Sequence, residues 1–214
     1  MKTAKYLLGF AGAAWAISAQ AAPFAEGFDD VSALGASGWL QTNTGAAPTQ
    51  PWFQGNSGVF GSQAGAPDSY VAANFLSSAT GAIDNWLISP VLTFDAGSML
   101  SFYTRSAGTQ GFADLLEVLV SDGSSNLADF VSLGTIGASS AYPTNWTLYS
   151  FALPTSATGR FAFRQGGSVD TADYLGVDTV SVAAVTNIPE PSTYALMALG
   201  IAGLTLVRRR RDAP

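Results

Sequence analysis

Short runs in which apolar and polar residues alternate recur through residues 22–188, and clusters of Gly, Ser, Asn and Asp separate them. A two-residue period predicts β-strands with one buried face, because successive side chains of a strand point to opposite sides. The clearest runs are 100–105, 115–120, 146–151, 160–164 and 174–182. The pattern therefore predicts an all-β domain, built as a two-layer antiparallel β-sandwich.

The alternation also predicts which side chains form the core of the sandwich. In 160–164 the two phenylalanines share one face and both arginines point the other way. In the last run, strict alternation places Thr179 on the face of Leu175 and Val177, opposite to Val180. The predicted core includes Leu100, Phe102, Val118, Val120, Leu148, Phe161, Phe163 and Val180.

Residues 1–21 have the three parts of a secretory signal peptide. Lys2 and Lys5 give a positive start, 6–17 is a short apolar segment, and Ala19 and Ala21 form a small-x-small cleavage pattern. We expect signal peptidase to cut before Ala22. The domain would then occupy 22–186 and be exported.

The C-terminal segment, 187–214, has three parts in a fixed order. A Pro189-Glu190-Pro191 motif comes first, then an apolar run over 194–207, and finally the cluster Arg208, Arg209, Arg210 and Arg211. As a helix, the apolar run would extend about 21 Å, which is marginal against a hydrocarbon core of about 30 Å. The arginines would stay on the cytoplasmic side. We therefore expect a short transmembrane helix that holds the precursor in the membrane briefly.

This order of motif, apolar helix and basic cluster resembles the PEP-CTERM sorting signal of Gram-negative bacteria. The resemblance implies that Pro189, Glu190 and Pro191 are recognised by an exosortase embedded in the inner membrane. It further implies that the released protein reaches the cell surface or the extracellular matrix, often in producers of exopolysaccharide. The two prolines favour an extended backbone there, which suits a protease.

The composition excludes several kinds of chemistry. The chain has no Cys and no His, which removes disulfides, cysteine or histidine metal sites and histidine-based catalytic triads. Away from the two ends, three arginines face thirteen acids and lysine is absent, a net charge of −10. That balance argues against nucleic acid as a partner and removes lysine nucleophiles from the mature domain.

Four sequence elements give the domain its own family resemblance. They are 24–29 with Gly38-Trp39, then 84–90 (Asp-Asn-Trp-Leu-Ile-Ser-Pro), 116–123, and 175–182. Together they resemble the choice-of-anchor J domain, which is similar to cleaved-adhesin and MAM-like jelly rolls. Thr179 departs from the pattern, which usually has Asn at that position, and 42–69 matches poorly. The resemblance implies a jelly-roll-like sandwich, and the activity of that family is ill defined.

Thirteen acids on a domain without lysine favour a hard divalent cation such as Ca²⁺. Ca²⁺ takes six to eight oxygen ligands and needs no local motif. Related jelly rolls often join their first and last strands through a structural calcium, which here implies Glu26, Asp29 and Asp178 as ligands. The alternative is that Asp178 accepts ordinary hydrogen bonds while the other two acids are solvated.

Carbohydrate is a second expected ligand, because exposed aromatic rings can stack on sugars. Trp52 and Phe53 are the best candidates, since they follow Pro51 in a loop-rich segment. For Trp39, Trp86 and Trp146 the expectation is burial in the core.

These observations favour a non-enzymatic exported protein, acting in adhesion or in a biofilm or exopolysaccharide matrix. A carbohydrate-binding module without catalysis is the alternative. A glycoside hydrolase is a weaker one, because only a carboxylate pair is left for catalysis and Asp84, Glu117, Asp173 and Asp178 have no recognisable spacing. No catalytic residue is therefore assigned.

Overall fold

In the computed structural model, the described residues are 24–95, 97–137, 140–154 and 158–184. The ordered elements among them are strands joined by loops and three short 3₁₀ helices, η1 (Val31–Ala33), η2 (Phe75–Ser77) and η3 (Leu127–Asp129). The strands are β1 (Phe24–Glu26), β2 (Leu40–Asn43), β3 (Phe53–Gln54), β4 (Val71–Asn74), β5 (Asn85–Ile88), β6 (Ser98–Ser106), β7 (Leu115–Ser121), β8 (Val131–Ile136), β9 (Thr147–Ala152), β10 (Arg160–Gly166) and β11 (Tyr174–Ala184).

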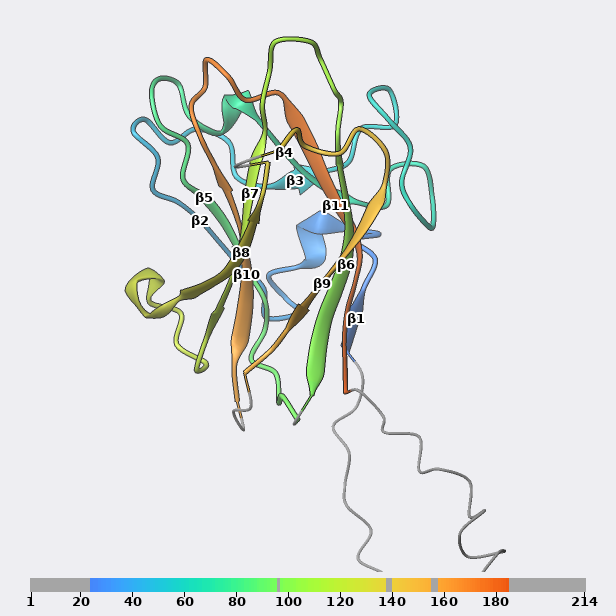
Figure 1. The fold of residues 1–214 in the computed structure, drawn as a ribbon, viewed down its shortest axis with the longest axis vertical. Helices are drawn as coiled ribbons and strands as arrows, with labels where there is room; N and C mark the ends of the chain where they lie inside the picture. The colour runs from blue at the N-terminus through green and yellow to red at the C-terminus, as the bar shows by residue number, and fades with distance from the viewer. Residues whose placement is uncertain (1–23, 96, 138–139, 155–157, 185–214) are drawn as a thin grey trace, which may run out of the picture. The chain divides into compact units, whose positions relative to one another are not determined.

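The strands form two sheets that pack face to face (Figure 1). One sheet has the order β3-β4-β11-β6-β9, with β1 paired to β11, and the other has the order β2-β5-β10-β7-β8. Every pairing between these strands is antiparallel. The predicted all-β, two-sheet antiparallel sandwich is confirmed. On one side of it, β8 and β9 are the outermost strands of their sheets.

The core lies between the sheets and is largely aromatic. Phe161 packs edge-on against Trp39 with 5.6 Å between ring centroids, and Phe163 packs edge-on against Phe102 at 4.8 Å. Such edge-to-face pairs are the favoured geometry of aromatic rings. Seven predicted core residues are buried: Leu100, Phe102, Val118, Val120, Phe161, Phe163 and Val180.

The prediction that the eighth residue, Leu148, belongs to the core is wrong. Leu148 lies on the outer face of its sheet, where it pairs with Tyr103, and its side chain is 53% exposed. Tyr149 and Phe151 pack against the core instead. Thr147–Ala152 does alternate as predicted, but the opposite set of residues faces inward because the pairing with β6 fixes the face.

A β-bulge interrupts the alternation predicted for the last strand. The register of β11 against β6 shifts between Asp178 and Ser181, and Thr179 has a φ of 50°. Because the bulge adds one residue, Leu175, Val177 and Val180 are all buried on the core side. The predicted opposition of Val177 and Val180 is therefore wrong, although both belong to the core.

Residues 55–69, which we call the covering loop, lie over the outer face of the six-stranded sheet. Phe60 stacks on Tyr70 with 5.0 Å between centroids and packs edge-on against Tyr174. Gly176 permits this contact, since a Cβ there would lie 2.8 Å from the Tyr70 ring. Aromatic packing thus fixes to the sheet the second part of 42–69, the segment that matched the family pattern poorly.

Both predicted end segments, 1–21 and 187–214, lie outside the described residues. No helix in the described part of the chain is long and apolar enough to cross a membrane.

Candidate functional site

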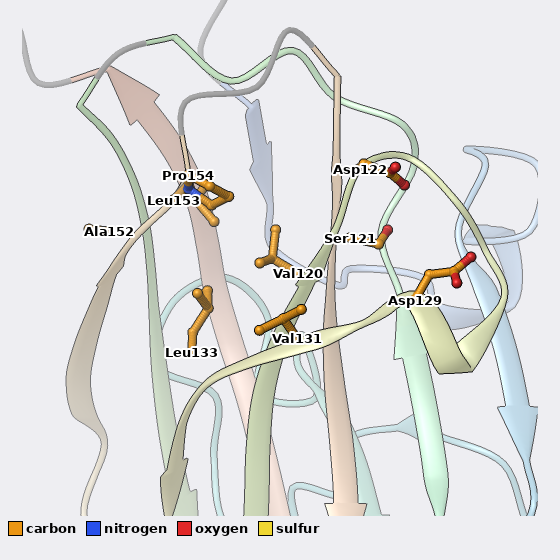
Figure 2. A pocket seen from close by; sticks show the side chains of 9 residues that line it. All are labelled: Val120, Ser121, Asp122, Asp129, Val131, Leu133, Ala152, Leu153 and Pro154. Carbon is orange, nitrogen blue, oxygen red and sulfur yellow. The ribbon is translucent and has the colours of Figure 1, made fainter.

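A groove opens between the outer edges of the two sheets, along β8 and β9, which have no further strand beside them among the described residues (Figure 2). Its volume is about 760 Å³, within the range typical of ligand sites. The apolar part is formed by Val120, Val131, Leu133, Ala152, Leu153 and Pro154. Ser121, Asp122 and Asp129 complete the lining. The groove is therefore an apolar surface with a carboxylate rim.

The groove is closed where β8 and β9 come together. A Cβ placed on Gly134 of β8 would lie 2.7 Å from Cε1 of Phe151 in β9. The Phe151 ring thus occupies the space that any side chain at 134 would need. From this contact the two strands diverge toward Val131 and Leu153, and the divergence creates the groove (Figure 2).

Val131 points toward the core side of its sheet but remains 67% exposed. Its partner in β7 is Val120, which is buried in the core, and residues paired across an antiparallel ladder share a face. The register then shifts. Ser132 pairs with Leu119 and Gly134 pairs with Val118, so Leu133 is an extra residue without a partner in β7. The bulge increases the local twist of β8 and turns this edge away from β9.

The acidic rim is held by the loop that joins β7 to β8. Ser124 donates its hydroxyl to Oδ2 of Asp129 at 2.6 Å and its N–H to Oδ1 of Asp122 at 3.4 Å. Asn126 caps η3 by accepting the N–H of Ala128. Both carboxylates are solvent-exposed, so they can receive a positive charge from outside. The site thus suits a ligand with an apolar body and a cationic group.

Two of the carboxylates considered for hydrolysis are held by one guanidinium. Arg164 contacts Asp84 at 2.5 Å and Glu117 at 2.9 Å. Burial alone would raise the pKa of Asp84, but hydrogen bonds from Thr44 and Arg164 hold that pKa below its usual value. A general acid needs a raised pKa, so this pair suits a structural role on the sheet surface.

A different carboxyl has a raised pKa. Asp114 is 3% exposed, and burial raises its pKa to about 6, with the nearby Asp173 adding to the effect. Oδ1 of Asp114 accepts the N–H of Asp173 at 2.9 Å. The cavity beside these acids is only about 210 Å³, below the usual size of a ligand pocket. It has room for a few water molecules, not for a sugar chain.

The predicted calcium ligands lie around the covering loop. Asp178 is fully buried, and its Oδ2 accepts the N–H of Gln63 at 2.7 Å and of Ala64 at 3.2 Å. Its Oδ1 accepts the N–H of Thr179 at 2.5 Å. Burial raises the pKa of Asp178, and these hydrogen bonds offset part of the rise.

The other two predicted ligands, Glu26 and Asp29, contact other groups than Asp178 does. Oε1 of Glu26 accepts the N–H of Phe28, and Asp29 lies beside Gly65. Over 24–184, omitting the undescribed positions, no group of three or more acidic side chains is arranged to hold a metal. N–H donors already bind both carboxylate oxygens of Asp178. Calcium binding at these three acids therefore stays a prediction.

The predicted stacking pair is divided between two environments. Trp52 is 2% exposed in the main core, and its Nε1–H donates to the carbonyl of Asn85. Its ring is therefore not available to a ligand. Phe53 is half-buried and packs edge-on against Tyr174. The aromatic surface lies instead on the outer face of β6 and the start of β9.

The residues of that surface are Tyr103, Arg105 and Trp146. All three are partly exposed. The Arg105 guanidinium lies over the Phe60 ring at 4.4 Å, and Trp146 donates its Nε1–H to the Gly61 carbonyl. Trp146 had been expected in the core. The sequence did not distinguish it from a core residue, because the covering loop shields part of a ring on an outer face.

The predicted processing residues lie outside the described part of the chain: Ala19, Ala21, Pro189, Glu190, Pro191, Arg208, Arg209, Arg210 and Arg211. A comparison with family models matches residues 187–211 to the PEP-CTERM protein-sorting motif. The predicted sorting signal at the C-terminus is confirmed by this match. No curated protein sequence matches the chain.

Solved structures show where the fold recurs. The K2 cleaved adhesin domain of Lys-gingipain is 21% identical, with a TM-score of 0.57 over 76% of this chain and 99% of that one. The K1 domain of Lys-gingipain from Porphyromonas gingivalis W83 is also 21% identical, with a TM-score of 0.57 over 76% and 98%. The K3 domain of the same strain is 20% identical, with a TM-score of 0.53 over 77% and 97%. The chain therefore has the fold of cleaved adhesin domains, as the sequence resemblance implied.

Proposed function

We propose that the protein is an exported, non-enzymatic adhesion protein of the cell surface or extracellular matrix, which binds its partner through the groove between β8 and β9. The observation that carries the proposal is the apolar groove itself. Val131 belongs to the core-facing side of β8, yet the described residues leave it exposed. Exposed apolar surfaces with a polar rim mark interaction sites.

The route to the surface rests on the two ends of the chain. Signal peptidase cuts after Ala21, and the apolar run 194–207 then holds the precursor in the inner membrane of a Gram-negative cell. An exosortase recognises Pro189, Glu190 and Pro191 and releases the domain. The sorting motif supports this route, and the adhesin fold is compatible with its destination.

The described carboxylates support a role without catalysis. Asp84 and Glu117 share Arg164, and Asp114 borders a cavity too small for a saccharide. A hydrolase needs an acid and a second carboxylate across a site that admits the sugar.

Carbohydrate binding is the second candidate, and a specific surface favours it. Tyr103 and Trp146 present partly exposed rings on the outer sheet face, beside the cation of Arg105. The hydroxyls of Ser101 and Ser150, 2.8 Å apart, add polar groups to the same face. An exopolysaccharide chain would lie flat across this surface, with sugar rings against the aromatics.

The proposed function is tested in a strain from which the protein has been deleted. Wild-type protein should restore attachment of cells to a surface, and a variant with Pro189, Glu190 and Pro191 changed to alanine should not. That variant should be exported but retained in the membrane fraction at precursor size. If it reaches the surface at the normal rate and size, exosortase processing is wrong. If deletion leaves attachment unchanged, the adhesion role is wrong.

A further inference from the structure

We propose that the groove takes an extended peptide segment of another protein, in which basic and apolar residues alternate, and that this segment pairs with the free edge of β8. This inference rests on the proposed function, since it names the partner of the same groove. Apolar side chains of the segment enter the groove, and its cationic side chains reach Asp122 and Asp129.

The edge of β8 is suited to pairing with another strand. β8 is the outermost strand of its sheet, so one side of its backbone faces away from β7. Its sequence, Val-Ser-Leu-Gly-Thr-Ile, contains no charge and no proline. Charged residues, proline and β-bulges are the usual protection of an edge strand against pairing, and of these β8 has only the bulge at Leu133. An added strand forms main-chain hydrogen bonds and places alternate side chains in adjacent pockets.

The apolar groove provides the side-chain contacts for such a strand. Val131 and Leu133 lie on one wall, and Leu153 and Pro154 lie on the other (Figure 2). Side chains of a paired strand recur on one face every second residue. Two successive inward side chains would therefore meet Val131 and Leu133 in turn. The Gly134–Phe151 contact closes the groove beyond them, which fixes the end of the segment.

The negative charge of the domain favours a partner with basic residues. Asp122 and Asp129 form the rim, and the described residues carry thirteen acids against three arginines. A field of one sign attracts the opposite charge over several ångströms. A second copy of this chain would bring its own acids to the rim and be repelled. The observations therefore favour a basic partner over self-association.

Binding of synthetic peptides to the mature exported protein tests this inference by calorimetry. The probe is a six-residue peptide of alternating valine and lysine, matched to the length of β8. Its counterpart has glutamate in place of lysine. We expect the lysine peptide to bind and the glutamate peptide to bind at least about tenfold more weakly. Raising the salt concentration should weaken binding of the lysine peptide, because salt screens the charges of the exposed rim.

Two matched pairs of variants locate the site. Val131→Lys should weaken binding of the lysine peptide by about tenfold or more. Leu40→Lys should leave this binding unchanged, although Leu40 is also an exposed residue of an edge strand, β2. The double variant Asp122→Asn and Asp129→Asn should also weaken binding of the lysine peptide. The control is the double variant Asp68→Asn and Asp170→Asn, which changes two exposed acids outside the groove and should leave binding unchanged. Both pairs alter side chains at the surface, so loss of folding is not expected.

N-methylation of the peptide tests the pairing with β8. Methyl groups on the amides that face β8 should abolish binding, and methyl groups on the alternate amides should leave it intact. Equal binding of lysine and glutamate peptides, equal loss in both members of a variant pair, or tolerance of both methylation patterns would overturn the inference. If no peptide binds while the wild type still restores attachment, this inference fails and the proposed function stands. If the peptide binds but deletion of the protein leaves attachment unchanged, the proposed function fails and this inference stands.

Discussion

The carboxylate of Asp178 accepts a 2.7 Å hydrogen bond from the N–H of Gln63, a residue 115 positions earlier in the chain. Asp178 lies on the outer face of β11, at the bulge, and Gln63 belongs to the covering loop. A second bond joins the hydroxyl of Thr179 to Oε1 of Gln63 at 2.7 Å. The bulge therefore attaches the covering loop to the middle of the six-stranded sheet.

Asp178→Asn should destabilise the protein. One carboxylate oxygen would become an NH₂ group facing N–H donors, which leaves buried polar groups without partners. We expect a loss of about 1–3 kcal/mol in the free energy of unfolding, measured by urea denaturation. Asp68→Asn in the same loop is the control, since Asp68 is exposed, and it should change little. Equal stability of the two variants would contradict the anchoring role of Asp178.

The calcium prediction has its own measurement, the melting midpoint in millimolar calcium and then in chelator. If Glu26, Asp29 and Asp178 bind calcium in the folded state only, a hundredfold excess over Kd adds about 2.7 kcal/mol of stability. The midpoint should then rise by several degrees, and Asp178→Ala should remove the rise. Identical midpoints in calcium and chelator would show that Asp178 acts through its hydrogen bonds alone.

Asp114 should make stability depend on pH. Its folded-state pKa of about 6 lies above the ordinary value of 3.8, so the native state holds this proton more tightly than the unfolded state does. The contribution is fully present below about pH 4 and is lost as the pH rises through about 6. Asp114→Asn keeps an oxygen that can accept the N–H of Asp173 and removes the buried charge.

We therefore expect Asp114→Asn to stabilise the protein at pH 7 by about 1–3 kcal/mol and to have little effect at pH 4. Urea denaturation of wild type and variant at both values measures the difference. The exposed Asp170→Asn serves as the control. A variant that is less stable than wild type at pH 7 would refute the effect of burial on this carboxyl.

Gly134 should tolerate no side chain. Because a Cβ at this position would lie 2.7 Å from the Phe151 ring, Gly134→Ala must displace β8 or the ring. Overpacking of this kind costs about 1–3 kcal/mol, which chemical denaturation would detect. Gly35→Ala is the matched control, since nothing lies within 4 Å of a Cβ there. If both variants are equally stable, β8 and β9 do not close the groove at this contact.

Local patterns in the sequence predicted the strands but not their irregularities. The alternation around Phe161 and Phe163 predicted both strand and face, because β10 is central and its pairing is regular. The same reasoning failed at Thr179 and Leu148. Whether an extra residue is inserted, or which face meets the core, depends on pairing with β6, and β6 is distant in the sequence.

The groove was not predictable for a related reason. Residues 130–133 are not among the alternating runs from which strands were predicted, and no expectation was attached to Val131. Its exposure depends on where β9 diverges from β8, which is a relation between two sheets. Trp52 shows the converse, since a tryptophan in a loop-rich segment is covered by core packing that no local pattern reveals.

Attachment should be measured for cells that carry Val131→Lys and for cells that carry Leu40→Lys at the same surface level, because Val131 lines the groove and Leu40 does not. Both variants add one cation to an exposed edge-strand position. We predict that Val131→Lys restores little or no attachment to the deletion strain and that Leu40→Lys restores it to the wild-type level. Full attachment with Val131→Lys would contradict the assignment of binding to the groove between β8 and β9.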